Sequence, residues 1–196
     1  MWDERYSEPG FAYGTEPNDF LRAVAPRLHQ GRALCLAEGE GRNAVFLAGL
    51  GFEVTAVDQS KVGLQKAAAL AKERGVSIAT QVADVTRLPL GEGAWDAIVS
   101  IWCHLPREPR AALHRACAAA LRPGGAFVLE AYTPDQLRFG TGGPRDAGLL
   151  MRLADLEAEL AGLTIVEARE VEREVHEGAY HTGRSAVVQL LATRPA

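Results

Sequence analysis

Acidic residues and glycines gather where three short apolar runs of the sequence end. The first run leads into Glu38-Gly39-Glu40-Gly41, the second closes with Asp58, and the third closes with Asp84. Glycines let the backbone turn tightly and approach a ligand, and a helix that starts there presents unpaired N–H groups. Asp58 is placed to accept hydrogen bonds from a ribose. This combination predicts a site for a nucleoside-containing cofactor.

Two cofactors fit these residues, and a tight turn that binds no ligand is the remaining alternative. The segment 39–44 satisfies the glycine pattern of dinucleotide-binding proteins, which would mean NAD. Glu38, however, would repel a pyrophosphate and would suit the cationic amino-acid end of S-adenosylmethionine (SAM). NAD proteins have no general need of Asp84, although this residue could also cap a turn. The acids therefore favour SAM.

The sequence between and after these motifs alternates β-rich and helical stretches, which predicts βαβ units around a mostly parallel, doubly wound α/β sheet. We expect strands at 33–38, 53–58, 76–84, 95–102 and 126–132. We expect helices at 43–50, from the cap Ser60 to residue 74, at 107–121 and at 151–160. The runs 164–175 and 185–193, joined through Gly178 and Gly183, predict a terminal antiparallel hairpin.

The length of 196 residues indicates a single domain. Within it we expect a helical N-terminal lid at 1–30, a cofactor-binding core at 31–132, and a substrate side at 133–196. The stretch 133–148 carries two prolines and four glycines, which predicts an irregular loop near the active face.

The composition of the chain limits the classes of partner and the cellular location that we expect. With 47% hydrophobic and 23% charged residues, the chain resembles an average globular protein. The net charge of −4 and the absence of a basic block argue against nucleic acid. No apolar run is long enough to span a membrane, and the charged start is unlike a secretory signal, so we expect a cytoplasmic protein. The three cysteines form no CxxC pair, so we expect neither a disulfide framework nor a metal site.

Several motifs together resemble the class I SAM-dependent methyltransferases. The run LCLAEGEGRNAVFLAGLGFEVTAVDQS is similar to their SAM-binding half, and its G-R-N resembles the tellurite-resistance and thiopurine methyltransferase-like group. LRPGGAFVLEAY, the opening WDERY with YGTEPN, and HTGRSAVVQLLATRP extend the resemblance over nearly the whole chain. The resemblance implies a seven-stranded, Rossmann-like methyltransferase fold.

The resemblance also implies roles for individual residues. Glu38, Gly39 and Gly41 would contact the amino-acid part of SAM. Asp58 with Gln59 would hold the ribose side, and Asp84 with Val85 the adenine. Ser100 would face the methionine end, with Trp102 and His104 in the loop that follows. The residues expected to form a lid over the cofactor are Arg5, Tyr6 and Tyr13.

The chemistry of methyl transfer gives further candidates. A hydroxyl or amine nucleophile benefits from a base with a pKa near working pH, and His104 is the best-placed histidine, with a structural role as its alternative. Arg138 and Arg145 flank the glycine-rich loop and could hold an anionic substrate, or could be surface charges. His176 and His181 are interpreted as solvent-exposed turn residues.

The favoured function is methyl transfer from SAM, yielding S-adenosylhomocysteine, to a small-molecule nucleophile such as a thiol or a chalcogen oxyanion. The alternatives are a non-catalytic SAM-binding module and an NAD-dependent oxidoreductase, which Glu38, Asp84 and the lack of a second substrate domain disfavour. We expect a monomer or homodimer without nucleic-acid or membrane partners.

Overall fold

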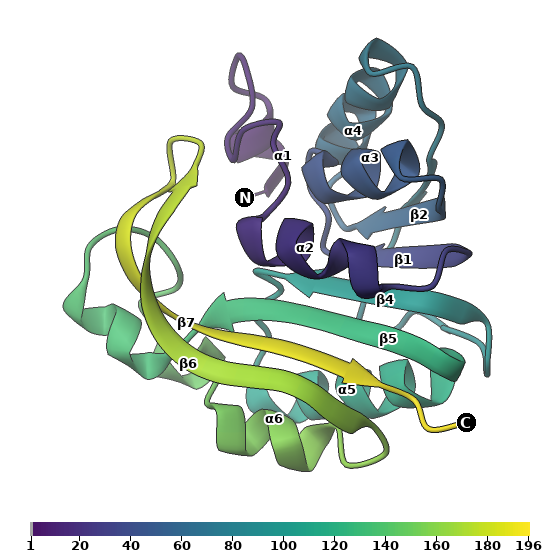
Figure 1. Cartoon of the computed structure of the whole chain (residues 1–196). Helices are drawn as coiled ribbons and strands as arrows, with labels where there is room; N and C mark the ends of the chain where they lie inside the picture. Colours follow the sequence, from purple (N-terminus) through teal and green to yellow (C-terminus); the bar gives the residue numbers. More distant parts are fainter. Residues whose placement is uncertain (1) are drawn as a thin grey trace.

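The computed structural model describes residues 2–196 and is organised around one seven-stranded sheet (Figure 1). The strands are β1 (Arg32–Leu36), β2 (Glu53–Asp58), β3 (Ala79–Val82), β4 (Trp95–Ile101), β5 (Leu121–Tyr132), β6 (Thr164–Glu177) and β7 (His181–Thr193). Their order is β3-β2-β1-β4-β5-β7-β6. The first five strands pair in parallel, and β7 pairs antiparallel with both β5 and β6. The predicted fold class is confirmed.

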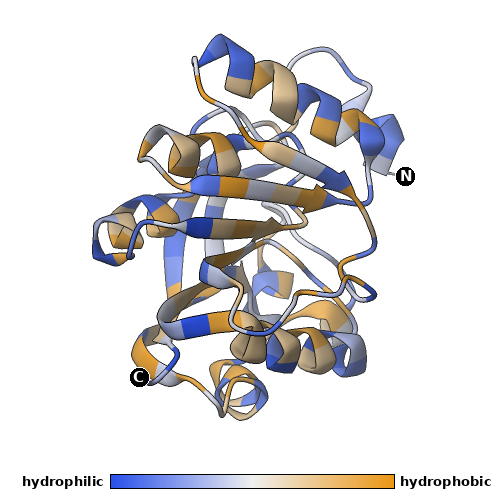
Figure 2. Cartoon of the chain, turned by 90° about the vertical axis from the view of Figure 1, so that its right-hand side faces the viewer, coloured by the Kyte–Doolittle hydropathy of each residue, from blue (hydrophilic) through white to orange (hydrophobic). Residues whose placement is uncertain are grey.

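Helices cover both faces of the sheet. They are α1 (Trp2–Tyr6), α2 (Asp19–Val24), α3 (Arg42–Gly49), α4 (Lys61–Glu73), α5 (Arg107–Ala120) and α6 (Leu153–Glu159), with 3-10 turns η1 (Ala25–Arg27), η2 (Pro134–Arg138) and η3 (Ala147–Leu149). Hydrophobic and hydrophilic positions alternate along these helices (Figure 2), as expected for elements with one face on a core.

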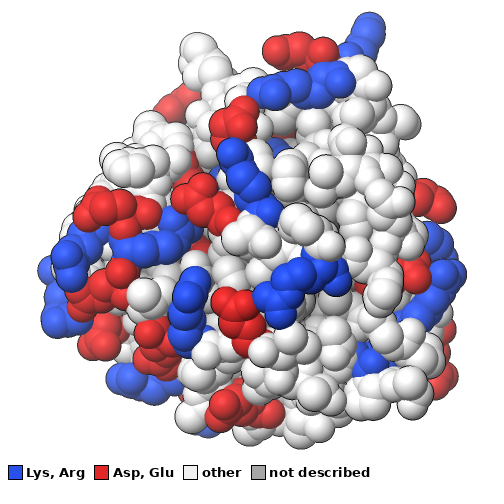
Figure 3. All heavy atoms as spheres, viewed as in Figure 1, with Lys and Arg blue, Asp and Glu red and all other residues white. Residues whose placement is uncertain are grey.

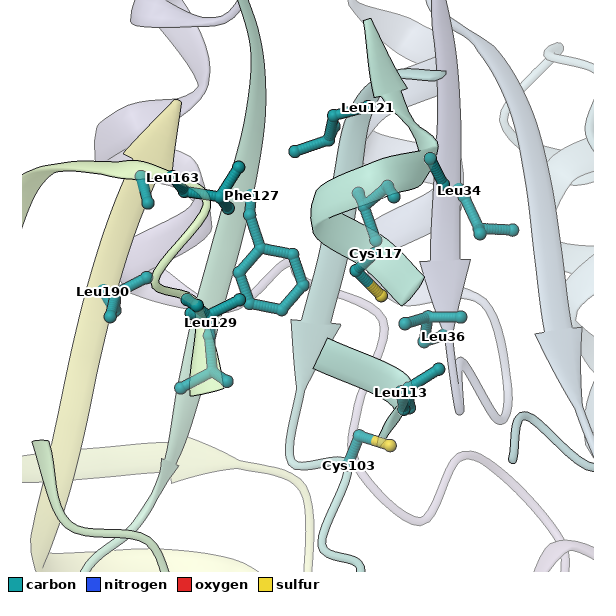
Figure 4. Packing of buried hydrophobic residues seen from close by; sticks show 14 of the residues in the cluster. Leu34, Leu36, Cys103, Leu113, Cys117, Leu121, Phe127, Leu129, Leu163 and Leu190 are labelled. Atoms are coloured by element: carbon teal, nitrogen blue, oxygen red, sulfur yellow. The ribbon is translucent and has the colours of Figure 1, made fainter. Parts of the chain in front are cut away.

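Alternation along the strands divides the core into two layers. Leu34 and Leu36 pack with α5 residues such as Cys117 (Figure 4), whereas Ala33 and Cys35 pack with α2 and α3. Successive strand side chains point to opposite faces, so a strand buried on both sides is apolar throughout. This is why β1, with four of its residues buried, could be predicted as a central strand.

The largest differences between expected and observed element boundaries are in three places. The third strand is limited to Ala79–Val82, all of it exposed at the sheet edge. The fifth begins at Leu121, so Pro123-Gly124-Gly125 lies inside β5, where its register against β4 shifts. The terminal hairpin is longer than predicted, because β6 continues to Glu177 and β7 begins at His181. Gly183 therefore lies within β7 and not in the turn.

The far end of the long hairpin curves towards the N-terminal segment, residues 2–14 (Figure 1). The amide of Ala179 donates to the carbonyl of Ala12 at 3.0 Å, and the Tyr180 hydroxyl donates to Glu8 at 3.0 Å. The N-terminal segment and the tip of the β6–β7 hairpin thus meet beside the carboxyl ends of the parallel strands. No helix among residues 2–196 is long and apolar enough to cross a membrane.

Candidate active site

A cavity of about 990 Å³ opens at the carboxyl ends of the parallel strands, the usual ligand site of open α/β sheets. Glu38, Asp58, Asp84 and Val85 line it after β1, β2 and β3, together with Gln59. The N-terminal segment, the loop after β5 and the hairpin line its other walls. The residues that the strand-end pattern singled out are therefore brought together.

Glu38 links the turn after β1 to the start of α3. Its Oε1 accepts hydrogen bonds from the backbone amides of Asn43 at 2.9 Å and Ala44 at 2.8 Å, groups that have no partner within the helix. Burial raises the pKa of Glu38 to about 7, although these bonds and the charge of Arg42 oppose the shift. A ligand cation beside this carboxyl would favour its ionised form.

Asp58 connects the first two strand ends. Its Oδ2 accepts from the amide of Gly39 at 2.9 Å and its Oδ1 from the amide of Ser60 at 2.8 Å. Burial raises the pKa of Asp58, and the two amides counteract that effect. The side chain is only 6% exposed and lines the cavity, so it is fixed before any ligand binds.

Gly39 and Gly41 do not line the cavity, and their predicted cofactor contacts therefore lack support. Both have positive φ, 60° and 90°. A Cβ on Gly39 would lie 2.5 Å from the Tyr6 hydroxyl, and one on Gly41 would lie 2.5 Å from Cβ of Ala67. These glycines permit close packing of the lid and of α4 on the turn.

Asp84 lies on the cavity wall and also caps a turn, since its Oδ1 accepts from the amide and the hydroxyl of Thr86 at 2.9 and 2.7 Å. These bonds lower the pKa of the exposed Asp84 carboxyl. Val85 beside it is 8% exposed and supplies an apolar surface. The turn-cap alternative is thus confirmed, and a ligand contact remains compatible with it.

The residues at the end of β4 and in the loop after it differ in how they meet the cavity. Ser100 is 2% exposed within β4 and does not line the cavity, so its predicted position facing the methionine end lacks support. Trp102, with φ of 58°, lines the cavity, and its Nε1 donates to Glu177 at 2.5 Å. The strained backbone of Trp102 turns the loop back over the strand ends.

His104 has both ring nitrogens engaged by backbone. Nε2 accepts from the amide of Tyr132 at 3.0 Å, and Nδ1 lies 3.1 Å from the carbonyl of Trp102, which assigns the proton to Nδ1. Burial lowers the pKa of His104 to about 3. The lone pair that a base would need is already used, and this geometry favours the structural alternative over catalysis.

The two predicted substrate arginines are on the cavity wall with different surroundings. Arg138 forms an ion pair with Glu172 at 2.8 Å and is largely solvated. Arg145 makes no hydrogen bond or ion pair with any described residue. Arg145 is therefore the more available cation for an anionic substrate.

The predicted lid residues Arg5, Tyr6 and Tyr13 all line the cavity. Arg5 donates to the Tyr13 hydroxyl at 2.8 Å, and its guanidinium lies 4.6 Å from the Tyr180 ring centroid. This cation–π contact joins the N-terminal segment to the hairpin turn.

The sequence analysis did not identify two residues of the candidate site, Glu40 and His181. Glu40 accepts from the amide of Ala12 at 2.7 Å and from Lys66 at 2.9 Å, which holds the lid on the cofactor turn. His181, predicted to be a solvent-exposed turn residue, is 8% exposed and lines the cavity. Residues 181–185 show no alternation of polar and apolar residues, so no local signal placed His181 in a strand. His176 is exposed as predicted, although it lies in β6 and not in the turn.

Comparison with known proteins agrees with this arrangement. Residues 33–125 match the family model described as a methyltransferase domain. No curated protein matches the sequence. Among solved structures, one from work on the conversion of a disulfide bond into a thioacetal group during echinomycin biosynthesis is 21% identical, with a TM-score of 0.78, over 98% of this chain and 88% of that one.

Two further structures are similar. TehB from Haemophilus influenzae is 20% identical, with a TM-score of 0.73, over 90% of this chain and 61% of that one. A SAM-dependent methyltransferase from Methanosarcina mazei is 15% identical, with a TM-score of 0.72, over 88% and 97%. At these identities the likenesses show the shared fold.

The residues on the cavity wall fit SAM. Glu38 provides a carboxyl for its ammonium group, the fixed carboxylate of Asp58 suits ribose hydroxyls, and Val85 provides an apolar surface for adenine. Residues 33–125 match a methyltransferase domain, and the fold is shared with solved SAM-dependent methyltransferases. The chain is a SAM-dependent methyltransferase, with SAM as its cofactor.

Proposed function

We propose that this enzyme transfers the methyl group of SAM to a small-molecule nucleophile, such as a thiol, a chalcogen oxyanion or a similar group. The observation that carries the proposal is a single cavity of about 990 Å³ with cofactor-type acids on one wall and Arg145 and aromatic rings on the others. Its size is at the upper end of small-molecule sites, and the lid narrows access to it.

SAM when bound supplies a methyl group that a sulfonium already activates. The protein then needs to align a nucleophile with the sulfur–methyl bond and exclude water. Trp102, Tyr13 and the loop around Arg145 enclose the substrate side of the cavity. The free guanidinium of Arg145 supports an acceptor that carries negative charge.

Surface charge supports a small acceptor over a nucleic acid. Basic and acidic side chains are interspersed on the face seen in Figure 3, where no extended region of one sign is present. A phosphate backbone is bound by clustered Lys and Arg, and the net charge of −4 opposes such binding. Figure 1 shows the cofactor end of the sheet crossed by the lid and hairpin.

A screen with methyl-labelled SAM tests the proposal. The candidates are thiols, tellurite and selenite, small carboxylic acids, bulk RNA and a protein lysate. We expect label in one or more small molecules, and Arg145→Gln to raise KM for an anionic acceptor and leave the Kd of SAM unchanged. Labelling confined to RNA or protein would contradict the proposal, and SAM binding without transfer to any acceptor would favour a non-catalytic module.

A further inference from the structure

His181 occupies an unusual position in the cavity wall. It is the first residue of β7, its side chain is 10% exposed, and it lines the cavity beside the hairpin turn. Its ring centroid lies 4.6 Å from that of Tyr13, 5.1 Å from Trp102 and 5.3 Å from Tyr132. Rings from the lid, the loop after β4 and the end of β5 therefore surround the imidazole.

The polar atoms of the His181 ring are not satisfied by the protein. Its Nδ1 is fully buried and has no hydrogen-bond partner among the described residues. The carboxylate of Glu177 faces it, with Oε2 at 3.8 Å from Nδ1, longer than a hydrogen bond. A lone pair on Nδ1 would be repelled by this carboxylate, whereas an N–H would be attracted. The tautomer protonated on Nδ1 is therefore favoured, and the lone pair belongs to Nε2.

The carboxylate of Glu177 is held in place beside His181 by hydrogen bonds from three parts of the chain. Its carboxylate accepts from Arg42 at 2.6 Å, from Trp102 Nε1 at 2.5 Å and from Asn18 at 2.8 Å. These bonds come from α3, the loop after β4 and the N-cap of α2, so several elements converge on one buried acid. Such a network keeps Glu177 ionised beside the imidazole.

We propose that His181, oriented by Glu177, is the general base of the methyl transfer, and that the acceptor carries a proton on its nucleophilic atom, as a hydroxyl, thiol or amine does. This inference rests on the proposed function and narrows its substrate class. His104, the base that the sequence suggested, has its lone pair occupied by the amide of Tyr132.

Burial is the main influence on the pKa of His181, and it favours the neutral ring. Burial lowers its pKa, and the charges of Arg42 and Arg5 act in the same direction, whereas Glu177 raises it. The remaining neighbours on packed elements are the rings of Tyr13, Trp102 and Tyr132 and the imidazole of His104. The hydroxyl of Tyr132 stays neutral as well, because burial raises its pKa.

The step balances with these groups alone. The nucleophilic atom of the acceptor forms a bond to the methyl carbon while the sulfur–methyl bond breaks, and the bonding pair stays on sulfur. The proton of the nucleophile passes to Nε2 of His181, and the resulting imidazolium faces the carboxylate of Glu177. The proton is then released to solvent.

The first test measures the histidine itself and needs no acceptor. Nitrogen-15 NMR of the imidazoles, assigned with His181→Gln, is expected to show His181 neutral at pH 7 with its proton on Nδ1. Glu177→Gln, checked for folding by circular dichroism, is expected to give mixed tautomers. A cationic ring, or a proton on Nε2 in the unmodified protein, would overturn the proposal whatever the variants do.

The second test compares phenol, which is protonated at pH about 8, with thiophenol, which is ionised there. We expect His181→Gln to lower kcat for phenol by about 10² or more and to change thiophenol methylation and the Kd of SAM by less than about threefold. His176→Gln, on the exposed side of the same hairpin, is the matched control. Equal losses on both probes, or none on phenol, would refute a base.

Failure of the proposed small-molecule methyl transfer can be distinguished from failure of the His181 proposal. If the unmodified protein binds SAM and methylates neither probe, the small-molecule proposal loses both acceptors. The NMR result still decides whether His181 has the free Nε2 that the inference requires.

Discussion

Asp58 combines a structural role with a binding role. Its two oxygens hold the amides of Gly39, in the turn after β1, and of Ser60, the N-cap of α4. A carboxylate fixed in this way loses little freedom when it accepts further hydrogen bonds from a ligand.

Replacement of Asp58 by alanine should therefore weaken SAM binding by at least about tenfold, the equivalent of about 1.4 kcal/mol for lost hydrogen bonds to a charged group. Calorimetric titration with SAM measures the change. Asp155→Ala, which removes a carboxylate on α6 that pairs with Arg107, is the control and should leave the affinity unaltered. An unchanged Kd for Asp58→Ala would remove this residue from the cofactor site.

For single residues, the sequence predicted the position of a side chain in the fold where the neighbouring residues determine that position. Glu38, Asp58 and Asp84 lie at or just after the ends of parallel strands, and these ends meet at one edge of the sheet. The sequence could not decide between the two roles of His104, and it misplaced His181 as an exposed turn residue, because the surroundings of both side chains come from distant residues. The partner of His104 Nε2 is 28 positions away, and Arg42 approaches Glu177 across 135 positions.

Among the elements, the turn of the β6–β7 hairpin packs directly against the N-terminal segment. Gly178 has φ of 65°, and a Cβ on it would lie 2.3 Å from the carbonyl oxygen of Ala12. Only glycine therefore permits the turn to touch the lid as closely as it does.

Gly178→Ala should displace the lid and weaken SAM binding, whereas Gly75→Ala should not. Gly75 has a similar φ of 70°, and an added Cβ meets no atom within 4 Å. Both variants should lose about 1 kcal/mol of stability through backbone strain. Hydrogen exchange of residues 8–14 should rise only in Gly178→Ala. Equal exchange and equal SAM affinity in the two variants would mean that this contact does not hold the lid.

The bounds of strands and helices were predicted best where the hydrophobic residues repeat with a clear period. The second strand, 53–58, has the expected bounds, and Ser60 caps α4 as predicted by accepting from the amide of Gly63 at 3.0 Å. The hairpin was misjudged because its glycines suggested a turn at Gly183. Thirteen residues of β7 pair with β5 or β6, and this pairing outweighs the local preference of glycine.

For the whole molecule, a buried ion cluster outside the cavity lining joins α5 to α6. Glu159 accepts from Arg110 at 2.7 Å and contacts Nδ1 of His114 at 2.7 Å. Burial opposes ionisation of Glu159, yet the bonds from His114 and Arg110 prevail and lower its pKa to about 2.

A carboxyl with a lowered pKa in the folded state stabilises the protein above its unfolded pKa, and this contribution is lost as pH falls. For Glu159 the loss falls between pH about 4.5 and about 2. Glu159→Gln should therefore be less stable by roughly 3–5 kcal/mol at neutral pH, and the difference should shrink below pH about 4.5. Urea unfolding at several pH values measures it, with exposed Glu157→Gln on the same helix as control. A pH-independent difference would contradict the assignment.

The strand order has a consequence for biosynthesis on the ribosome. β7 lies between β5 and β6, although it follows both in the chain. While the ribosome is still adding residues 181–193, β6 has no place in the sheet, and the lid has not met its partner at Ala179. The cavity can therefore close only after β7 has been synthesised, and SAM binds to the finished site after that point.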